Sequence, residues 1–131
     1  MLKDGILNPQ IAKVLSETGH MDTIVVSDAG LPVPAETERI DLAWKPNEPR
    51  YLPVLDEVLK NIVVEKAYLA DELKTVSPGF HLEILKRLEG IDVEYVEHTH
   101  LKEMTKASRA IIRTGEFTPY PSIILVAGCA Y

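Results

Sequence analysis

Apolar residues along the chain alternate between helical spacing and strand spacing. Asn8-Pro9 predicts the start of a helix, because an Asn side chain accepts a hydrogen bond from a free backbone N–H and Pro needs no partner at the first helical position. Ile11 and Val14 follow at helical spacing, and Gly19 is expected to end this helix by taking a positive φ. The next segment, TIVVS at residues 23–27, is rich in β-branched residues and predicts a buried strand.

This alternation continues to the end of the chain. Further strands are predicted over residues 39–43, 63–69, 92–96, 110–113 and 123–126, and further helices over residues 54–59, from Ser77-Pro78 to Gly90, and over residues 101–107. Strands separated by helices of about ten residues indicate a mostly parallel sheet that is covered on both faces. The sequence therefore predicts the fold class α/β, as a single three-layer α/β/α domain over residues 1–131.

Composition narrows the classes of function. The 131 residues are 46% hydrophobic, and 14 basic against 20 acidic groups give a formal net charge of −6. That charge argues against nucleic acid as a partner, because phosphate binding needs a surplus of Lys and Arg on one face. The apolar run at residues 123–127 is far shorter than the about 20 residues of a membrane span. With one cysteine, Cys129, and no signal-like run at the N-terminus, we expect a cytoplasmic protein without disulfides or membrane contact.

Ligands of open α/β sheets bind beyond the carboxyl ends of strands, so polar loops that follow strands are the first candidates. We take the segment at residues 19–34, which contains His20 and Asp28, as the first of these loops. Asp28 directly follows a predicted strand, although an Asp before Gly also forms turns with its own backbone. His20 follows a helix end, where the helix dipole favours an imidazolium suited to an acid, and capping of the last carbonyls is an equally weighted alternative.

Two histidines, His98 and His100, follow the predicted strand at residues 92–96. They would share one face of a continued strand, which suits metal ligands, but no third ligand or H-E-x-x-H pattern accompanies them. We therefore expect no metal, with one histidine facing a pocket and the other capping the next helix. His81 lies among apolar residues of a predicted helix and is expected to be a surface or packing residue.

The segment from Arg113 to Ser122 concentrates polar residues beside two prolines. Fixed φ values at the prolines stiffen the backbone and would hold Tyr120 ready to hydrogen-bond a polyol or to move a proton. Packing at a strand start is the alternative for Tyr120, and a mutual ion pair is the structural alternative for Arg113 and Glu116. No G-x-G-x-x-G or G-K-[ST] pattern is present, so nucleotide binding is not indicated.

These segments, in this order and spacing, resemble the D-ribose pyranase family, part of the wider ribose pyranase and fucose mutarotase group. The matching stretches are Gly19-His20-Met21-Asp22, Asp28-Ala29-Gly30-Leu31-Pro32-Val33-Pro34, Ile40-Asp41-Leu42 and Ile111-Ile112-Arg113-Thr114-Gly115-Glu116-Phe117-Thr118-Pro119-Tyr120. The resemblance runs nearly end to end and is weakest between residues 51 and 88. It implies an isomerase that interconverts the pyranose and furanose forms of D-ribose without a cofactor.

The resemblance also implies an assembly and a set of site residues. The assembly is a homodecamer of two pentameric rings, with active sites at subunit interfaces. His20 matches the family's catalytic proton donor, and Asp28, His98 and Tyr120 match substrate-binding positions. Ser122 stands where the family usually has Asn, so a hydroxyl replaces an amide and one sugar contact is expected to be shorter or made through water.

Elementary chemistry supports the same reaction. Opening a hemiacetal ring requires removal of the anomeric hydroxyl proton and protonation of the ring oxygen, and reclosure on another hydroxyl reverses these roles. Histidine, with an ordinary pKa of about 6.5, suits both directions. We therefore expect His20 to be the acid and His98 to be its base partner or a substrate clamp. Two alternatives stay open: a ribose-binding accessory protein without catalysis, and a fucose-type mutarotase that inverts the anomeric centre.

Overall fold

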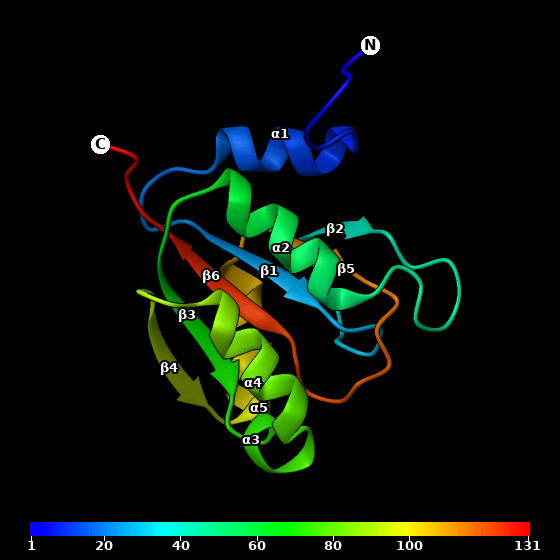
Figure 1. The fold of residues 1–131 in the computed structure, drawn as a ribbon, viewed down its shortest axis with the longest axis vertical. Helices are drawn as coiled ribbons and strands as arrows, with labels where there is room; N and C mark the ends of the chain where they lie inside the picture. Colours follow the sequence, from blue (N-terminus) through cyan, green and yellow to red (C-terminus); the bar gives the residue numbers. More distant parts are fainter.

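A six-stranded sheet forms the middle layer of the structure (Figure 1). The computed structural model describes all of residues 1–131. Its helices are α1 (Pro9–Glu17), α2 (Tyr51–Asn61), α3 (Leu73–Val76), α4 (Pro78–Arg87) and α5 (His98–Met104), with the 3-10 turn η1 (Thr105–Ala107) after α5. Its strands are β1 (Thr23–Ser27), β2 (Glu38–Asp41), β3 (Val64–Ala70), β4 (Asp92–Val96), β5 (Ala110–Arg113) and β6 (Ile123–Ala127). None of the helices combines the length and the apolar character that a membrane crossing requires.

The strands lie in the order β2-β5-β1-β6-β3-β4. β1, β2 and β5 run parallel to one another, and β3 runs parallel to β4. β6 lies between β1 and β3 and runs antiparallel to both. The predicted α/β class with a mostly parallel sheet is therefore confirmed. The direction of β6 was not predicted, because an apolar run such as Ile123–Ala127 carries no signal of direction.

Helices cover the two faces of the sheet unequally. α1, α2 and α4 pack on one face, and α5 lies behind the sheet in Figure 1. In that view α2 and α4 lie in front of the strands and α1 lies above them. Successive side chains of β1 point to opposite faces. Ile24 and Val26 therefore join the larger core of 17 buried residues, while Val25 joins a cluster of five buried residues that includes Leu101 of α5.

The first helix begins as predicted and ends by a different mechanism. The Asn8 side chain accepts a hydrogen bond from the Ile11 N–H at 2.9 Å, as an N-cap does. At the other end Thr18 is extended, and its hydroxyl donates to Val14 O at 2.6 Å. The expectation of a positive φ at Gly19 is wrong, because the helix has already ended at Thr18 and the left-handed residue is Met21, with φ of 71°.

Other segments also differ from the predictions, among them β2, α3 and α5. β2 starts at Glu38 and ends at Asp41, whose Oδ1 accepts the Ala43 N–H at 3.1 Å and turns the chain out of the strand. The four-residue helix α3 was not predicted, because it is too short to show a helical period. The last predicted helix starts at His98 rather than at residue 101, because the Glu72 carboxylate accepts the His98 N–H.

The backbone after β5 lies directly against the loop that precedes α2. The Gly115 N–H donates to Pro49 O at 2.9 Å, and Gly115 O accepts the Asn47 N–H at 2.7 Å. A Cβ atom on Gly115 would lie 2.7 Å from Glu48 N, a distance that real Cβ atoms essentially never show. Only glycine therefore fits here without a backbone shift, and this contact positions the segment that leads to Tyr120.

We expect Gly115→Ala to lower the free energy of unfolding by about 1–3 kcal/mol, because the added methyl group forces two backbone segments apart. Gly79→Ala is the matched control, since a Cβ there meets no atom within 4 Å. It should be neutral or stabilise by up to about 1 kcal/mol, because alanine favours the helix. Urea unfolding measures both, and equal values for the two variants would contradict the close approach.

Candidate active site

Asp28 directly follows β1 and is held in one orientation. Its Oδ1 accepts the Gly30 N–H at 2.7 Å, and its Oδ2 accepts the Ser122 hydroxyl at 2.8 Å. The side chain faces a hollow of about 490 Å³, whose lining also includes Gly30, Arg113 and Thr118. Asp28 is only 9% exposed, so a small part of its side chain is open to this hollow, and the two hydrogen bonds fix the orientation of that part.

Ser122 lies behind Asp28, just before β6. It is 1% exposed, and its Oγ both donates to Asp28 Oδ2 and accepts the Asp28 N–H at 3.1 Å. The structure thus brings the two predicted residues together, with Ser122 directed at the Asp28 carboxylate. In this arrangement Ser122 orients the group that faces the hollow.

His98 is the first residue of α5 and lies beside Tyr120. Its backbone N–H donates to both Glu72 carboxylate oxygens, at 3.2 and 2.9 Å, which fixes the start of the helix. Its ring meets the Tyr120 ring edge-on, with 4.9 Å between the centroids. Nδ1 of His98 is buried and has no hydrogen-bond partner in the protein. A buried polar atom without a partner is a candidate contact for a ligand.

The environment of His98 favours the neutral ring. Burial lowers the pKa of His98 below its ordinary 6.5, and the Lys102 ammonium lowers it further, while the Asp28 and Glu72 carboxylates act in the opposite direction. A neutral imidazole is a donor at one nitrogen and an acceptor at the other. It can therefore hydrogen-bond a sugar hydroxyl in either sense.

Tyr120 occupies a strained backbone position. Its φ is 69°, in the left-handed region that aromatic residues rarely adopt. The residue before it is tied to the start of α4, because the Ser77 hydroxyl donates to Pro119 O at 3.0 Å. Such strain persists only where the surroundings enforce it, and it is concentrated at functional sites. The predicted stiffness of this loop thus comes from tertiary contacts as well as from its prolines.

A buried carboxylate, Glu116, ties the loop before Tyr120 to the start of α2. Glu116 is 1% exposed, and its Oε1 accepts the Arg50 Nε–H and the Tyr51 N–H, both at 3.1 Å. Its Oε2 accepts the Thr118 hydroxyl at 2.9 Å and lies 3.0 Å from the Arg50 guanidinium.

The alternative of an Arg113–Glu116 pair is wrong, because Arg113 pairs with Asp41 at 3.0 Å. Sequence reasoning missed the true partner of Glu116, since Arg50 lies 66 residues away along the chain.

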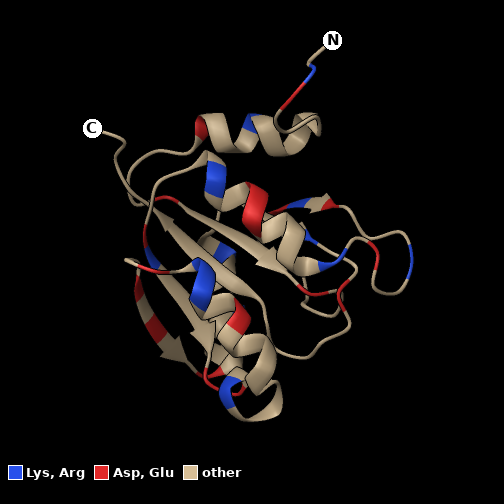
Figure 2. Cartoon of the chain, in the orientation of Figure 1, with Lys and Arg blue, Asp and Glu red and all other residues tan.

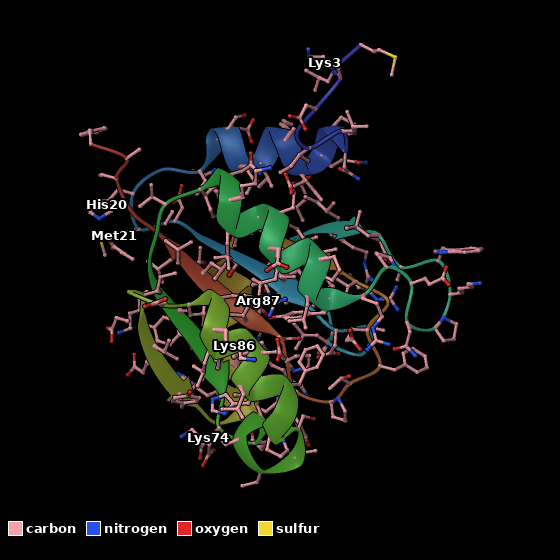
Figure 3. The ribbon with its side chains drawn as sticks, in the orientation of Figure 1. Lys3, His20, Met21, Lys74, Lys86 and Arg87 are labelled. Carbon is pink, nitrogen blue, oxygen red and sulfur yellow. The ribbon has the colours of Figure 1, made fainter.

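His20 lies at the opposite end of β1 from Asp28. It belongs to the turn between α1 and β1 and lies beside the C-terminal segment (Figure 3). The five residues of β1 span roughly 16 Å, so the two side chains do not meet within one chain. Grouping His20 with the loops that follow strands is therefore wrong, because its turn precedes β1. Its Nε2 instead lies 3.2 Å from Glu65 Oε2.

The other candidate residues lie outside this cluster. His81 contacts the Tyr95 hydroxyl through Nε2 at 2.6 Å, which agrees with a packing residue. His100 is exposed, and a spacing of two on helix α5 does not place it on the same side as His98. No group of three or more His, Cys, Asp and Glu side chains is arranged to hold a metal ion. Lys and Arg are interspersed with Asp and Glu along the chain (Figure 2).

The fold and this cluster define a small α/β protein with a polar pocket suited to a hydroxylated ligand. The family model of the RbsD / FucU transport protein family matches residues 1–130, and the chain belongs to this family. The D-ribose pyranase of Lactobacillus gasseri is 47% identical over 131 residues, which is all of both chains. The D-ribose pyranase of Geobacillus thermodenitrificans is 48% identical over 128 residues, or 98% of this chain and 97% of its own.

Two solved structures share the fold over nearly the whole chain. Bacillus subtilis RbsD, determined in complex with D-ribose, superimposes with a TM-score of 0.96 at 40% identity and covers 100% of both chains. The fucose mutarotase of Streptococcus pneumoniae, in complex with L-fucose, has a TM-score of 0.78 at 25% identity, covering 99% of this chain and 100% of its own. The chain is thus more similar to the ribose-bound structure than to the fucose-bound one.

Burial of His98 makes stability depend on pH. The pKa of His98 is lower in the folded than in the unfolded chain, so the unfolded state binds more protons as the pH drops below about 6.5. The free energy of unfolding therefore decreases as the pH is lowered. We expect His98→Gln to reduce this fall between about pH 7 and about pH 5, measured by urea unfolding at each pH. His100→Gln, on the same helix and exposed, is the control and should behave like the unmodified chain. An unchanged pH dependence in His98→Gln would contradict the buried ring.

Removal of the Glu116 carboxylate should destabilise the fold strongly. Glu116→Ala leaves the Arg50 guanidinium, the Tyr51 N–H and the Thr118 hydroxyl without their shared acceptor. We expect the free energy of unfolding to fall by about 2–4 kcal/mol. Glu94→Ala, which removes an exposed carboxylate paired with Lys66, should change it little. Similar losses in the two variants would rule out the organising role of Glu116.

Proposed function

We propose that this chain is a D-ribose pyranase, an isomerase that interconverts the pyranose and furanose forms of D-ribose without a cofactor. The observation that carries the proposal is the oriented Asp28 carboxylate at the edge of a hollow. His98, whose ring meets Tyr120 edge-on, lies near enough for the Asp28 charge to act on its pKa. The similarity to D-ribose pyranases over the full chain supports the choice of sugar, as does the fold shared with a ribose-bound structure.

Asp28 is proposed to bind sugar hydroxyls. An ionised carboxylate offers about four acceptor positions, of which Gly30 and Ser122 fill one on each oxygen. The unfilled positions on the side of the hollow can accept hydrogen bonds from two neighbouring hydroxyls. Because the carboxylate is already oriented, little further ordering is needed when the sugar binds.

His98 and Tyr120 are proposed to complete the sugar pocket. The neutral His98 ring is the proposed base or clamp that binds the anomeric hydroxyl. Tyr120 supports that ring edge-on and offers its own hydroxyl as a hydrogen-bond partner. Ser122 contributes through Asp28, which gives a role to a hydroxyl where the family usually has an amide.

The proton for the ring oxygen is proposed to come from His20 of a second copy of the chain. Ring opening needs an acid near the pocket, and His20 of the same chain lies at the far end of β1. A neighbouring subunit whose His20 end meets the Asp28 end of this one would complete the site. The homodecamer of two pentameric rings that the resemblance implies is the proposed assembly, and the cytoplasm is the proposed location.

Exchange NMR on D-ribose at equilibrium tests the proposed activity. The protein should accelerate exchange between pyranose and furanose forms, and Asp28→Asn should lower the rate at least roughly 100-fold, because an oriented acceptor is lost. L-fucose is the control sugar. Ribose binding without faster exchange would indicate a binding accessory protein, and turnover of L-fucose alone would indicate a fucose-type mutarotase.

Co-expression of two inactive variants tests the shared site. His20→Ala lacks the acid but keeps the pocket, and Asp28→Asn lacks the pocket carboxylate but keeps the acid. Each variant alone should therefore be inactive. Random mixing places an intact acid against an intact pocket in roughly one quarter of the interfaces, and about that share of the activity should return. No recovery in mixed oligomers would place the acid within the same chain as the pocket.

A further inference from the structure

We propose that Glu65 is a positioning residue for His20: its carboxylate holds the imidazole at Nε2, so that Nδ1 is the nitrogen that exchanges a proton with the sugar. The two side chains meet at 3.2 Å between His20 Nε2 and Glu65 Oε2, although they are 45 residues apart in the sequence. This inference rests on the proposed function, which gives His20 its catalytic task.

An irregularity in β3 aims Glu65 toward His20. β3 pairs with β6 through Val64 and Ala127 and then through Lys66 and Val126, so Glu65 is an extra residue without a partner on β6. A bulge of this kind redirects the side chain of the extra residue, and such bulges are frequent beside active sites. The carboxylate that contacts His20 thus comes from the bulged residue of β3, where the pairing with β6 shifts its register.

A missing side chain leaves room for this pair. β6 separates β3 from β1 in the sheet, and Gly128 follows its last residue. A Cβ on Gly128 would lie 3.4 Å from both Cβ and Oε2 of Glu65 and 3.1 Å from Cγ1 of Val63. A Cβ here would be tight against Val63 and in contact with the Glu65 carboxylate, whereas glycine leaves the end of β6 open for that carboxylate.

The turn that carries His20 is anchored on both sides of that residue. The Gly19 N–H donates to Asp22 Oδ2 at 2.8 Å, and the Met21 N–H donates to Ala127 O at 2.9 Å. Met21 takes the left-handed conformation, and both His20 and Met21 extend away from the body of the sheet in Figure 3. The backbone at His20 is thereby fixed, and the orientation of its ring depends on Glu65.

The pairing assigns separate tasks to the two ring nitrogens. A carboxylate only accepts hydrogen bonds, so Nε2 keeps its proton in the neutral and in the charged ring. Nδ1 gives its proton to the ring oxygen as the bond from that oxygen to the anomeric carbon breaks and the electron pair moves to the oxygen. The anomeric hydroxyl loses its proton to the base, His98 in the proposed function. On reclosure the attacking hydroxyl gives its proton to Nδ1, and the base returns its proton to the carbonyl oxygen, so both groups are restored.

Glu65→Leu and Glu65→Gln test the proposal by separating kcat from KM in ribose exchange. Because Glu65 does not touch the sugar, Glu65→Leu should lower kcat roughly 10- to 100-fold and leave KM unchanged. Gln keeps an oxygen that accepts the Nε2 proton, so Glu65→Gln should recover part of kcat. Glu94→Leu removes an exposed carboxylate from the neighbouring strand and should retain full activity. An unchanged kcat in Glu65→Leu would overturn the proposal.

A direct readout of His20 separates this inference from the proposed activity. In deuterated protein with labelled histidine, the ring nitrogen resonances of the neutral His20 should report a proton on Nε2 alone. In Glu65→Leu they should shift toward the average of a ring with both tautomers populated. Resonances that do not change would overturn the pairing, whether or not the protein turns over ribose. Changed resonances in a protein without ribose exchange would support the pairing and refute the pyranase function.

Discussion

The direction of β6 decides where the functional groups of this chain lie. β6 is the strand between β1 and β3, and it runs against both of them. Its start therefore brings Ser122 to the carboxyl end of β1, beside Asp28, and its end brings Gly128 to Glu65, near the turn that carries His20. A wholly parallel sheet collects its ligand-binding loops at one edge. Because one strand in the middle of this sheet is reversed, loops at both ends of β1 carry polar side chains: Asp28 and Ser122 at one end, and His20 at the other.

Two buried carboxylates differ in how completely hydrogen bonds from the protein satisfy them. A charge in the interior is costly unless partners satisfy it. Glu116 is satisfied on both oxygens by Arg50, Tyr51 and Thr118, so nothing remains for a ligand. Asp28 borders the same hollow as Glu116, but it has only one protein partner on each oxygen. The first carboxylate holds the loop that leads to Tyr120, and the second is left with acceptor positions for hydroxyl groups.

Local signals in the sequence were sufficient for most of the fold. The β-branched run at β1, the Asn8 cap and the alternation along β4 depend only on neighbours, and these elements lie where they were predicted. Signals that depend on tertiary contacts were not readable. The partner of Glu116, the direction of β6 and the bulge at Glu65 are set by residues distant in the sequence. For the same reason the motif that contains both His20 and Asp28 did not reveal that β1 holds the two apart.

Because His20 lies across β1 from the pocket, the number of complete sites under the proposed function depends on protein concentration. A site built from two copies exists only while the copies are associated, so its abundance follows the association equilibrium rather than the number of folded chains. On dilution below the dissociation constant, turnover per chain declines although each chain keeps its core and its Asp28 pocket. With the proposed shared site, activity in this dilute range rises more steeply than in proportion to protein concentration, because each added chain carries one pocket and supplies the His20 of another.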